Sequence, residues 1–197
     1  MNIIDAISNR RSVRKFADKD IGRDILEKIL RAGINAPSPK NTQPWKFVVV
    51  TKEGKRDMFY AINRGVEKIK SNTGSFANTM FHLSSAGNTI KTMEEAPVVI
   101  IVMNTGNKYM SKQSSAKRYK EITNLLSSGA SIENMLLAAL ENGIGSLWIS
   151  DIFFFARELA EWLNTDKQIV AAIAFGYPDE NPPRPPRKDM DTLVEWR

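Results

Sequence analysis

The chain has no cysteine and a single histidine, His82, among its 197 residues. The lack of cysteine excludes disulfides, thiolate metal sites and cysteine nucleophiles. The single histidine excludes a metal site with several histidine ligands, and any Ser-His-Asp triad would have to use His82. His82 stands among asparagines and serines, as surface or lid histidines do. We therefore predict that no metal is bound and that protein side chains do not carry the chemistry.

Long apolar runs are also missing. The longest run, Ile169–Phe175, has seven residues, whereas a helix needs about 20 to cross a bilayer. Near the N-terminus, Asp5 stands where a signal peptide would have its apolar stretch, and no small-residue cleavage site follows. We expect a cytoplasmic protein that does not engage a membrane.

The remaining composition is ordinary for a globular domain, with 42% hydrophobic and 25% charged residues. A length of 197 residues fits one domain with a sizeable core, or one half of an intertwined dimer. The net charge of +6 suits an anionic ligand or nucleic acid and does not choose between them. We expect a single domain over residues 1–197.

The apolar pattern predicts both helices and strands. Spacings of three and four predict helices over Asn2–Asn9, Asp24–Asn35, Lys52–Lys70, Lys117–Asn142 and Phe153–Leu163. Continuous apolar or β-branched runs predict strands over Trp45–Thr51, Ala96–Met103 and Gln168–Phe175, with a short strand or turn at Gly145–Ile152. This order of elements predicts an α+β fold, in which helices flank a central sheet of four or five strands.

Three segments lack such a pattern. Residues 71–93 are polar and weakly patterned, and we expect an excursion or lid there. Residues 104–115 are also polar and are expected to be mobile. The last segment, residues 179–197, contains four prolines, which predict an extended C-terminal arm. The apolar residues near its end could pair with or pack on another surface.

The stretch Arg10–Phe16 reads Arg-Arg-Ser-Val-Arg-Lys-Phe. Guanidinium groups bind phosphate in a forked geometry, and a serine hydroxyl or a free backbone N–H can add further donors. This composition is typical of an anion site. A solvated basic turn is the alternative, and a charge run by itself favours it.

The stretch Ala36–Trp45 is the most specific in the chain. Its three prolines predict an irregular loop, on which Ser38, Asn41 and Gln43 offer hydrogen-bond donors and acceptors. Amide side chains match the edge of a flavin or nucleobase, because both present a donor beside an acceptor. An ordinary connection between a helix and a strand is the alternative, and composition alone leaves both interpretations open.

The chain resembles the nitroreductase family of FMN-dependent oxidoreductases over nearly its whole length. The resemblance rests on four stretches that occur in the family's order: Arg10–Phe16; Ala36–Ser38 with Asn41–Trp45; Gly143–Ile149; and Phe175–Pro178 with the basic, proline-rich stretch that ends at Arg187-Lys188. The resemblance implies a mostly antiparallel sheet in an intertwined homodimer, with two FMN sites at the interface between the subunits.

The resemblance also implies roles for individual residues. The FMN phosphate and ribityl chain would be held by Arg10, Arg11 and Ser12, with Arg187 returning to the phosphate. Arg14 would lie along the pyrimidine edge of the flavin. The residues that would approach the same flavin, in part from the other subunit, are Pro37, Ser38, Pro39, Asn41 and Gln43. The ring near the reactive N5 would be lined by Trp148, Ile149 and Ser150.

Elementary chemistry agrees with these roles. A flavin phosphate carries about two negative charges near neutral pH, so two or three arginines are a sensible complement. Reduced flavin is anionic around N1, and Arg14 is the type of residue that stabilises such a charge. A cofactor that performs hydride chemistry would also explain a chain without cysteine and with one histidine.

The chain departs from the family at Ser150-Asp151, where many relatives have Glu-Gly or Gly-Gly. An aspartate close to the flavin would disfavour its anionic reduced form unless the side chain points away. Some relatives also place polar contacts over the pyrimidine ring. The candidates for these contacts here are Asn63, Arg64 and Asn78.

Three hypotheses follow. The first is an FMN oxidoreductase that takes hydride from NADH or NADPH and reduces a small molecule, such as a nitroaromatic, a quinone or a second flavin, by a ping-pong mechanism. The second is a non-enzymatic FMN-binding or sensing protein on the same scaffold. The third is a nucleic-acid-binding module that uses Arg10–Lys15 and Arg184–Lys188. No recognition-helix or aromatic-strand signature accompanies those runs, so we expect no nucleic-acid partner.

Overall fold

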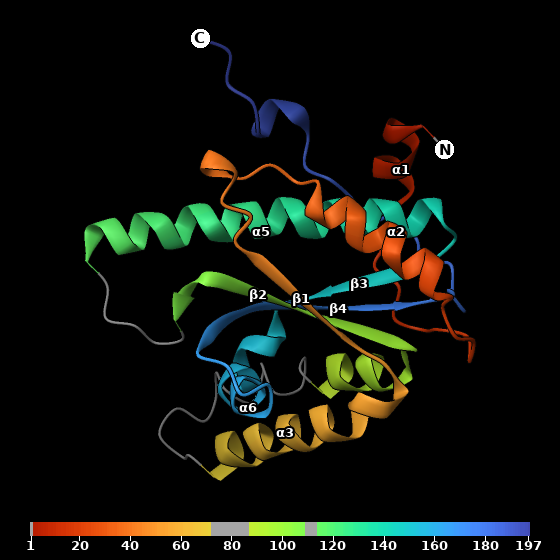
Figure 1. The fold of residues 1–197 in the computed structure, drawn as a ribbon. Helices are drawn as coiled ribbons and strands as arrows, with labels where there is room; N and C mark the ends of the chain where they lie inside the picture. The colour runs from red at the N-terminus through yellow and green to blue at the C-terminus, as the bar shows by residue number, and fades with distance from the viewer. Residues whose placement is uncertain (1, 72–86, 109–113) are drawn as a thin grey trace.

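The computed structural model describes residues 2–71, 87–108 and 114–197 of the chain, and Figure 1 shows their arrangement. In chain order the elements are α1 (Ile3–Asn9), α2 (Arg23–Ile34), the 3-10 helix η1 (Pro39–Asn41), β1 (Trp45–Val50), α3 (Lys52–Ser71), β2 (Val98–Lys108), α5 (Ser115–Glu141), β3 (Gly145–Ile149), η3 (Asp151–Phe155), α6 (Ala156–Trp162), β4 (Lys167–Gly176) and η4 (Met190–Thr192). A further helix occupies residues 87–95.

The four strands of the described residues form one antiparallel sheet in the order β1-β2-β4-β3. β2 pairs with β1 on one side and with β4 on the other. β3 pairs with β4 from Gly145 opposite Gly176 to Ile149 opposite Ala172. Because β2 and β4 lie in the middle and are covered on both faces, their sequences are continuous apolar runs without polar alternation.

Helices cover both faces of this sheet (Figure 1). α2 and α5 lie on one face, and α3, α6 and the helix at residues 87–95 lie on the other. Successive residues of β2 point to opposite faces. Ile100 packs with Ile29 and Met135 in the core beneath α2 and α5. Ile101 packs with Met58 in the core on the α3 face.

The chain turns sharply between α5 and β3. α5 ends at Glu141, and Gly143 has a φ of +72°, a left-handed conformation that glycine adopts without steric cost. The turn sends the chain from the helical layer directly into β3. Gly143 therefore determines where the functional stretch Gly143–Ile149 enters the sheet.

The structure confirms the α+β fold and the sheet flanked by helices that the sequence predicts. β2 continues past the expected end at Met103 to Lys108, so the prediction that residues 104–108 are mobile was wrong. Asn104 is the first residue of this extension. Its side chain is fully buried, yet its Nδ2 donates to Gln168 Oε1 at 3.1 Å and its Oδ1 accepts from Asn124 Nδ2 at 3.2 Å. A buried amide with partners does not end a strand.

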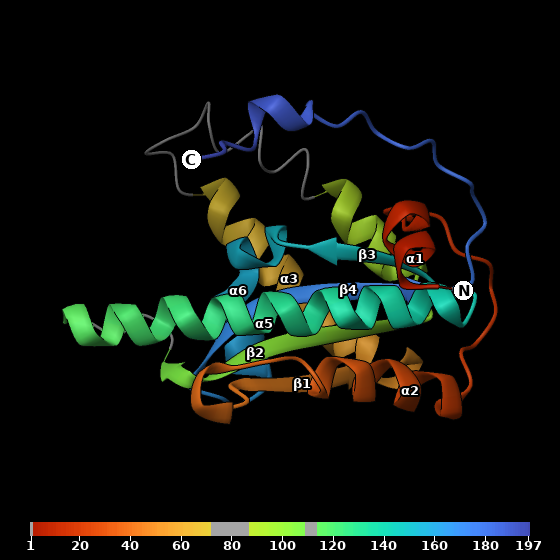
Figure 2. The ribbon, with the colours of Figure 1, turned by 90° about the horizontal axis from the view of Figure 1, so that it is seen from above.

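The expected excursion at residues 71–93 falls largely outside the described residues, as does His82. The part of it that the structure describes from residue 87 onward belongs to the helix at residues 87–95. The expected C-terminal arm contains one short helix, η4. Figure 2 shows the arm running outside the helical layers along the length of the molecule. Among the described residues, no helix is both long enough and apolar enough to cross a membrane.

The end of β4 generates a prediction about stability. A Cβ atom at Gly176 would lie 2.7 Å from Phe16 Cδ1 and 2.7 Å from Pro97 Cδ. Pro97 is buried and Phe16 is partly buried, so neither side chain can move away freely, and Gly176→Ala should lower the free energy of unfolding by about 1–3 kcal/mol. The same change at Gly87, where a Cβ would meet nothing within 4 Å, should alter it by less than about 0.5 kcal/mol. Urea denaturation of both variants measures the difference, and equal stabilities would contradict the close packing at Gly176.

Candidate functional site

The basic run lies across the ends of β3 and β4. Ser12 forms a parallel bridge with Ser146, and Val13 N donates to Ser146 O at 3.0 Å. A Cβ at Gly145 would lie 3.0 Å from the Val13 side chain, so glycine lets the run approach β3 this closely. Ala17 N donates to the carbonyl that follows β4, Tyr177 O, at 2.9 Å. Three of the four stretches behind the resemblance therefore meet at one end of the sheet.

Glu180 fixes the conformation of this run. Its Oε1 accepts a hydrogen bond from Arg14 N at 2.5 Å and is 3.3 Å from Lys15 N. Asp179 N donates in turn to Lys15 O at 3.0 Å. The carboxylate occupies backbone donors, so the cationic side chains of the run are not needed to hold it in place. Glu180 was not predicted as a site residue, although a carboxylate two residues after Pro178 was a possible signal.

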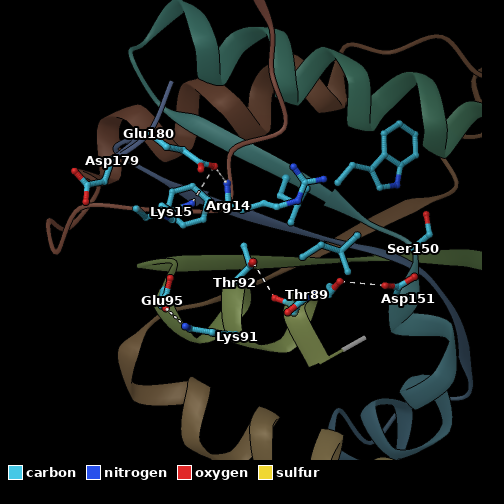
Figure 3. Close-up of a pocket in the computed structure, with 15 residues that line it drawn as sticks. Arg14, Lys15, Thr89, Lys91, Thr92, Glu95, Ser150, Asp151, Asp179 and Glu180 are labelled. Atoms are coloured by element: carbon cyan, nitrogen blue, oxygen red, sulfur yellow. Dashed lines mark hydrogen bonds and ion pairs between the residues drawn. The ribbon is translucent and has the colours of Figure 1, made fainter. Parts of the chain in front are cut away.

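A cavity of about 790 Å³ opens beside the run. Of the predicted site residues, it brings together Arg14, Trp148, Ile149 and Ser150. Figure 3 shows Arg14 and Glu180 along one side, Thr89 and Thr92 along the opposite side, and Ser150 with Asp151 at one end. The volume lies within the range of about 300–1,000 Å³ that is usual for ligand sites.

The opposite wall is the helix at residues 87–95, which the sequence analysis did not identify as part of the site. It contributes Asn88, Thr89, Lys91, Thr92 and Glu95 to the lining. Its polar sequence had only suggested an excursion. A weakly amphipathic sequence does not indicate where a segment packs in the fold. Thr89 Oγ1 donates to Asp151 Oδ2 at 3.0 Å, so this wall is joined to the end of β3.

Lys55 supports this wall from α3. Its Nζ donates to Glu94 O at 2.5 Å and to Ala96 O at 2.7 Å, at the carboxyl end of the helix, where a positive charge is favourable. Burial lowers the pKa of the Lys55 ammonium. The polar candidates named from the sequence do not line the cavity: Arg64 pairs with Glu161 at 2.8 Å, Asn63 lies exposed on α3, and Asn78 is outside the described residues.

Arg10 and Arg11 line a second cavity of about 170 Å³, which also includes Gly143, Ser146 and Pro178. The two cavities adjoin, because Glu180 lines both.

Both guanidinium groups have partners within the chain. Arg10 Nε lies 3.4 Å from Glu133 Oε1 on α5. Arg11 Nη1 donates to the carbonyls of Ser8 and Arg10, each at 2.8 Å, at the end of α1. These contacts hold two cations next to the larger cavity.

The loop Ala36–Trp45 lies elsewhere. Figure 2 shows α2, η1 and β1 on one side of α5, with β3 and α1 on the other side. Pro37, Pro39, Asn41 and Gln43 are exposed, and no residue of the loop is among the described residues that line the larger cavity. A single chain therefore does not bring this loop to the other three stretches.

The loop nevertheless has a fixed shape. Ser38 Oγ accepts a hydrogen bond from Gln43 N at 2.9 Å, and Ser38 O accepts one from Asn41 N at 3.0 Å. Lys40, Asn41 and Gln43 have φ values of 53°, 53° and 44°. Left-handed conformations at residues other than glycine carry strain, and they are often associated with functional sites. The structure thus presents the amide side chains outward from a constrained loop.

Arg187 lies in the exposed arm and is not brought to Arg10. Its Nη1 is 3.4 Å from the carbonyl oxygens of Pro185 and Pro186. Its predicted return to the phosphate stays a prediction.

The residues present fit FMN. Trp148 and Ile149 belong to the lining of the larger cavity, and Arg14 offers a charged donor there. The adjoining cavity supplies two guanidinium groups, the type of group that binds a phosphate. The described residues contain no group of three or more His, Cys, Asp or Glu side chains that could hold a metal ion.

Comparison with known proteins finds relatives over most of the chain. The model of the nitroreductase family matches residues 7–177. The Bacillus subtilis (strain 168) protein YfhC, provisionally named an NAD(P)H nitroreductase, is 26% identical over an alignment of 181 positions that covers 90% of this chain and 85% of YfhC.

Solved structures share the fold. A provisionally named nitroreductase from Desulfovibrio desulfuricans, crystallised in complex with FMN, has a TM-score of 0.73 and 27% identity, covering 100% of this chain and 98% of its own. A BluB-like flavoprotein from Clostridium difficile 630 has a TM-score of 0.82 and 24% identity, covering 100% of this chain and 99% of its own. At 24% identity the second likeness concerns the fold alone.

The position of Glu180 generates a prediction. Glu180→Ala removes the acceptor for Arg14 N and Lys15 N, and should lower the free energy of unfolding by about 1 kcal/mol, because the group is only partly buried. Glu180→Gln keeps a carbonyl acceptor and should recover most of this loss. Thermal and urea denaturation compare the three proteins. If Glu180→Ala is as stable as the parent, the carboxylate does not hold the run.

Proposed function

Because this chain belongs to the nitroreductase family, we propose that it is an FMN-dependent oxidoreductase that uses NADH or NADPH to reduce a small molecule. The acceptor would be a nitroaromatic, a quinone or a second flavin. The observation that carries the proposal is the meeting of the basic run, β3 and the end of β4 around one cavity. NADH and NADPH are intracellular reductants, so the proposal includes a cytoplasmic location.

The chain's own residues would bind and orient the cofactor. Arg10, Arg11 and Ser12 would hold the phosphate and ribityl chain, and Arg14 would lie at the pyrimidine edge. Trp148, Ile149 and Ser150 would line the ring. When bound, FMN supplies the hydride chemistry. No side chain needs to act as an essential acid or base, which agrees with a chain that has no cysteine and one histidine.

A second copy of the chain would complete the site. The loop with Pro37, Ser38, Pro39, Asn41 and Gln43 is shaped and exposed, yet it lies away from the cavity of its own chain. The proposal is therefore a homodimer in which each loop reaches the partner's cavity.

Exposed apolar side chains support this assembly. Ile3 and Ile7 on α1 are 61% and 56% exposed, Leu126 on α5 is 70% exposed, and Trp196 in the arm is 83% exposed. Ile3 and Ile7 are four residues apart and lie on one face of α1, and exposed apolar side chains grouped in this way mark interaction surfaces. A dimer that covers them would also explain an arm that has little contact with its own chain.

Donor and acceptor would occupy the same cavity in turn, as a ping-pong mechanism requires. The volume of about 790 Å³ accommodates a flat ring and one further aromatic group. Steady-state rates measured at several concentrations of both substrates test this order of binding, because a ping-pong mechanism gives parallel double-reciprocal lines.

The function predicts a specific spectrum. The purified protein, reconstituted with FMN, should show flavin absorption that bleaches on anaerobic addition of NADH or NADPH, and the faster of the two identifies the donor. Flavin bands that neither nicotinamide bleaches would instead indicate a non-enzymatic FMN-binding protein. No bound flavin after reconstitution would contradict the proposal.

Arg14→Ala provides the matched test of the site within the same experiment. It removes one charged hydrogen-bond donor from the cavity, and such bonds contribute roughly 1.5–3 kcal/mol, so FMN affinity should fall by about tenfold or more. Arg31→Ala, on the exposed side of α2, removes the same charge away from the cavity and should leave the affinity unchanged.

A further inference from the structure

Asp151 lines the larger cavity directly after Ser150, and the structure fixes where it lies. It directly follows Ser150 and begins η3. Ile149, two residues before it, is 2% exposed, and Ile152, directly after it, is 0% exposed. Because the chain is buried in the core on both sides of this short stretch, the backbone holds Asp151 at the cavity that it lines.

The carboxylate of Asp151 accepts a hydrogen bond from a residue of another element, the helix at residues 87–95. Thr89 Oγ1 donates to Asp151 Oδ2 at 3.0 Å, and Figure 3 shows this hydrogen bond at the end of the cavity, beside Ser150. The helix that carries Thr89 is itself anchored, since Thr92 and Met93 are 5% and 1% exposed. The negative charge therefore has a defined position, which a side chain directed into solvent would lack.

The charges that line the cavity differ in sign from the chain as a whole. The chain carries a net charge of +6. The cavity lining contains the cations Arg14, Lys15 and Lys91 and the carboxylates Glu95, Asp151, Asp179 and Glu180. Lys91 lies 3.7 Å from Glu95, which reduces its effect on the rest of the cavity. Figure 3 shows Glu95, Asp179 and Glu180 toward one end of the cavity and Asp151 with Ser150 toward the other. Asp151 is therefore the carboxylate drawn at the Ser150 end, whereas Arg10 and Arg11 line the adjoining cavity.

A charge fixed in a partly enclosed cavity acts more strongly than one in bulk water, because the effective dielectric constant is lower. The guanidinium groups of Arg10 and Arg11, suited to a phosphate, and the carboxylate of Asp151, beside the residues expected to meet the ring, thus lie in separate places.

From this separation we propose that Asp151, positioned by Thr89, is a specificity-determining residue. It makes bound FMN harder to reduce, and it favours neutral or cationic aromatic acceptors over anionic ones. The inference rests on the proposed function, because it concerns FMN in this cavity. If Asp151 had only a structural role at the start of η3, its ability to accept a hydrogen bond would matter and its charge would not. The two roles are therefore separated by Asp151→Asn, which keeps a carbonyl acceptor for Thr89 and removes the charge.

The first experiment is a reductive titration of the FMN-loaded protein against reference dyes. Asp151→Asn should shift the midpoint potential of the bound flavin to a more positive value. Asp57→Asn is the matched control, because Asp57 is an exposed carboxylate on α3 and its removal changes the net charge equally. That variant should leave the potential unchanged. An Asp151→Asn potential equal to that of the parent would overturn the inference.

The second readout compares two naphthoquinones, one with a sulfonate and one with a quaternary ammonium substituent. Their intrinsic reactivities cancel when the ratio of their kcat/KM values is compared between proteins. Asp151→Asn should lower the preference for the cationic quinone by about fivefold to tenfold, the scale of one charge interaction near a protein surface. An unchanged ratio counts against the inference.

The remaining outcomes are also decisive. If the parent protein binds no FMN, the proposed function fails and the inference fails with it. If the parent binds FMN and only the Asp151 effects are absent, the inference alone fails. If Asp151→Asn does not fold, Asp151→Ser takes its place. Its bound flavin should have a more positive midpoint potential than that of the parent, and an unchanged potential would overturn the inference.

Discussion

The backbone hydrogen bonds that hold residues 12–17 against the ends of β3 and β4 are the constraint on which the site depends. Val13 is bonded to Ser146 and Ala17 to Tyr177, while Glu180 takes up the backbone donors of Arg14 and Lys15. A run of like charges would repel itself as a free turn. Held by main-chain contacts and one carboxylate, the same run can keep several guanidinium groups near one ligand.

The fold supplies this end of the sheet with two kinds of wall. β3 is an edge strand that pairs with the central strand β4, and its residues Leu147 and Ile149 are buried in the core. The helix at residues 87–95 is joined to it by the Thr89–Asp151 hydrogen bond and supported by Lys55. The loop Ala36–Trp45 remains outside this arrangement in a single chain. Its constrained, outward-facing amides are understandable if a second chain is the intended neighbour.

Much of this could be predicted from the sequence. The helices and strands could be predicted from the spacing of apolar residues. The two central strands could be predicted from their continuous apolar runs, because a strand covered on both faces has no solvent-facing positions for polar residues. The contact between the basic run and Gly143–Ile149 could not be predicted from pattern, because it depends on a bridge between residues 134 positions apart, Ser12 and Ser146. The helix at residues 87–95 was not predicted as part of the site for a related reason. It lines the cavity because of its position in the fold, which its weakly amphipathic sequence does not indicate. Glu180 and Thr89 act through single hydrogen bonds, for which composition gives no signal.

The central claim is that two chains build each site, and mixed dimers test it most directly. One chain would carry Arg10→Ala and Arg14→Ala, and the other Asn41→Ala and Gln43→Ala. Each variant alone should form dimers that retain little FMN. In a dimer of one chain of each kind, one site combines all the defects and the other is intact, so the account predicts one FMN per dimer. Mixed dimers that bind no more FMN than the two parent variants would contradict it, because they would place the basic run and the loop of one chain in the same site.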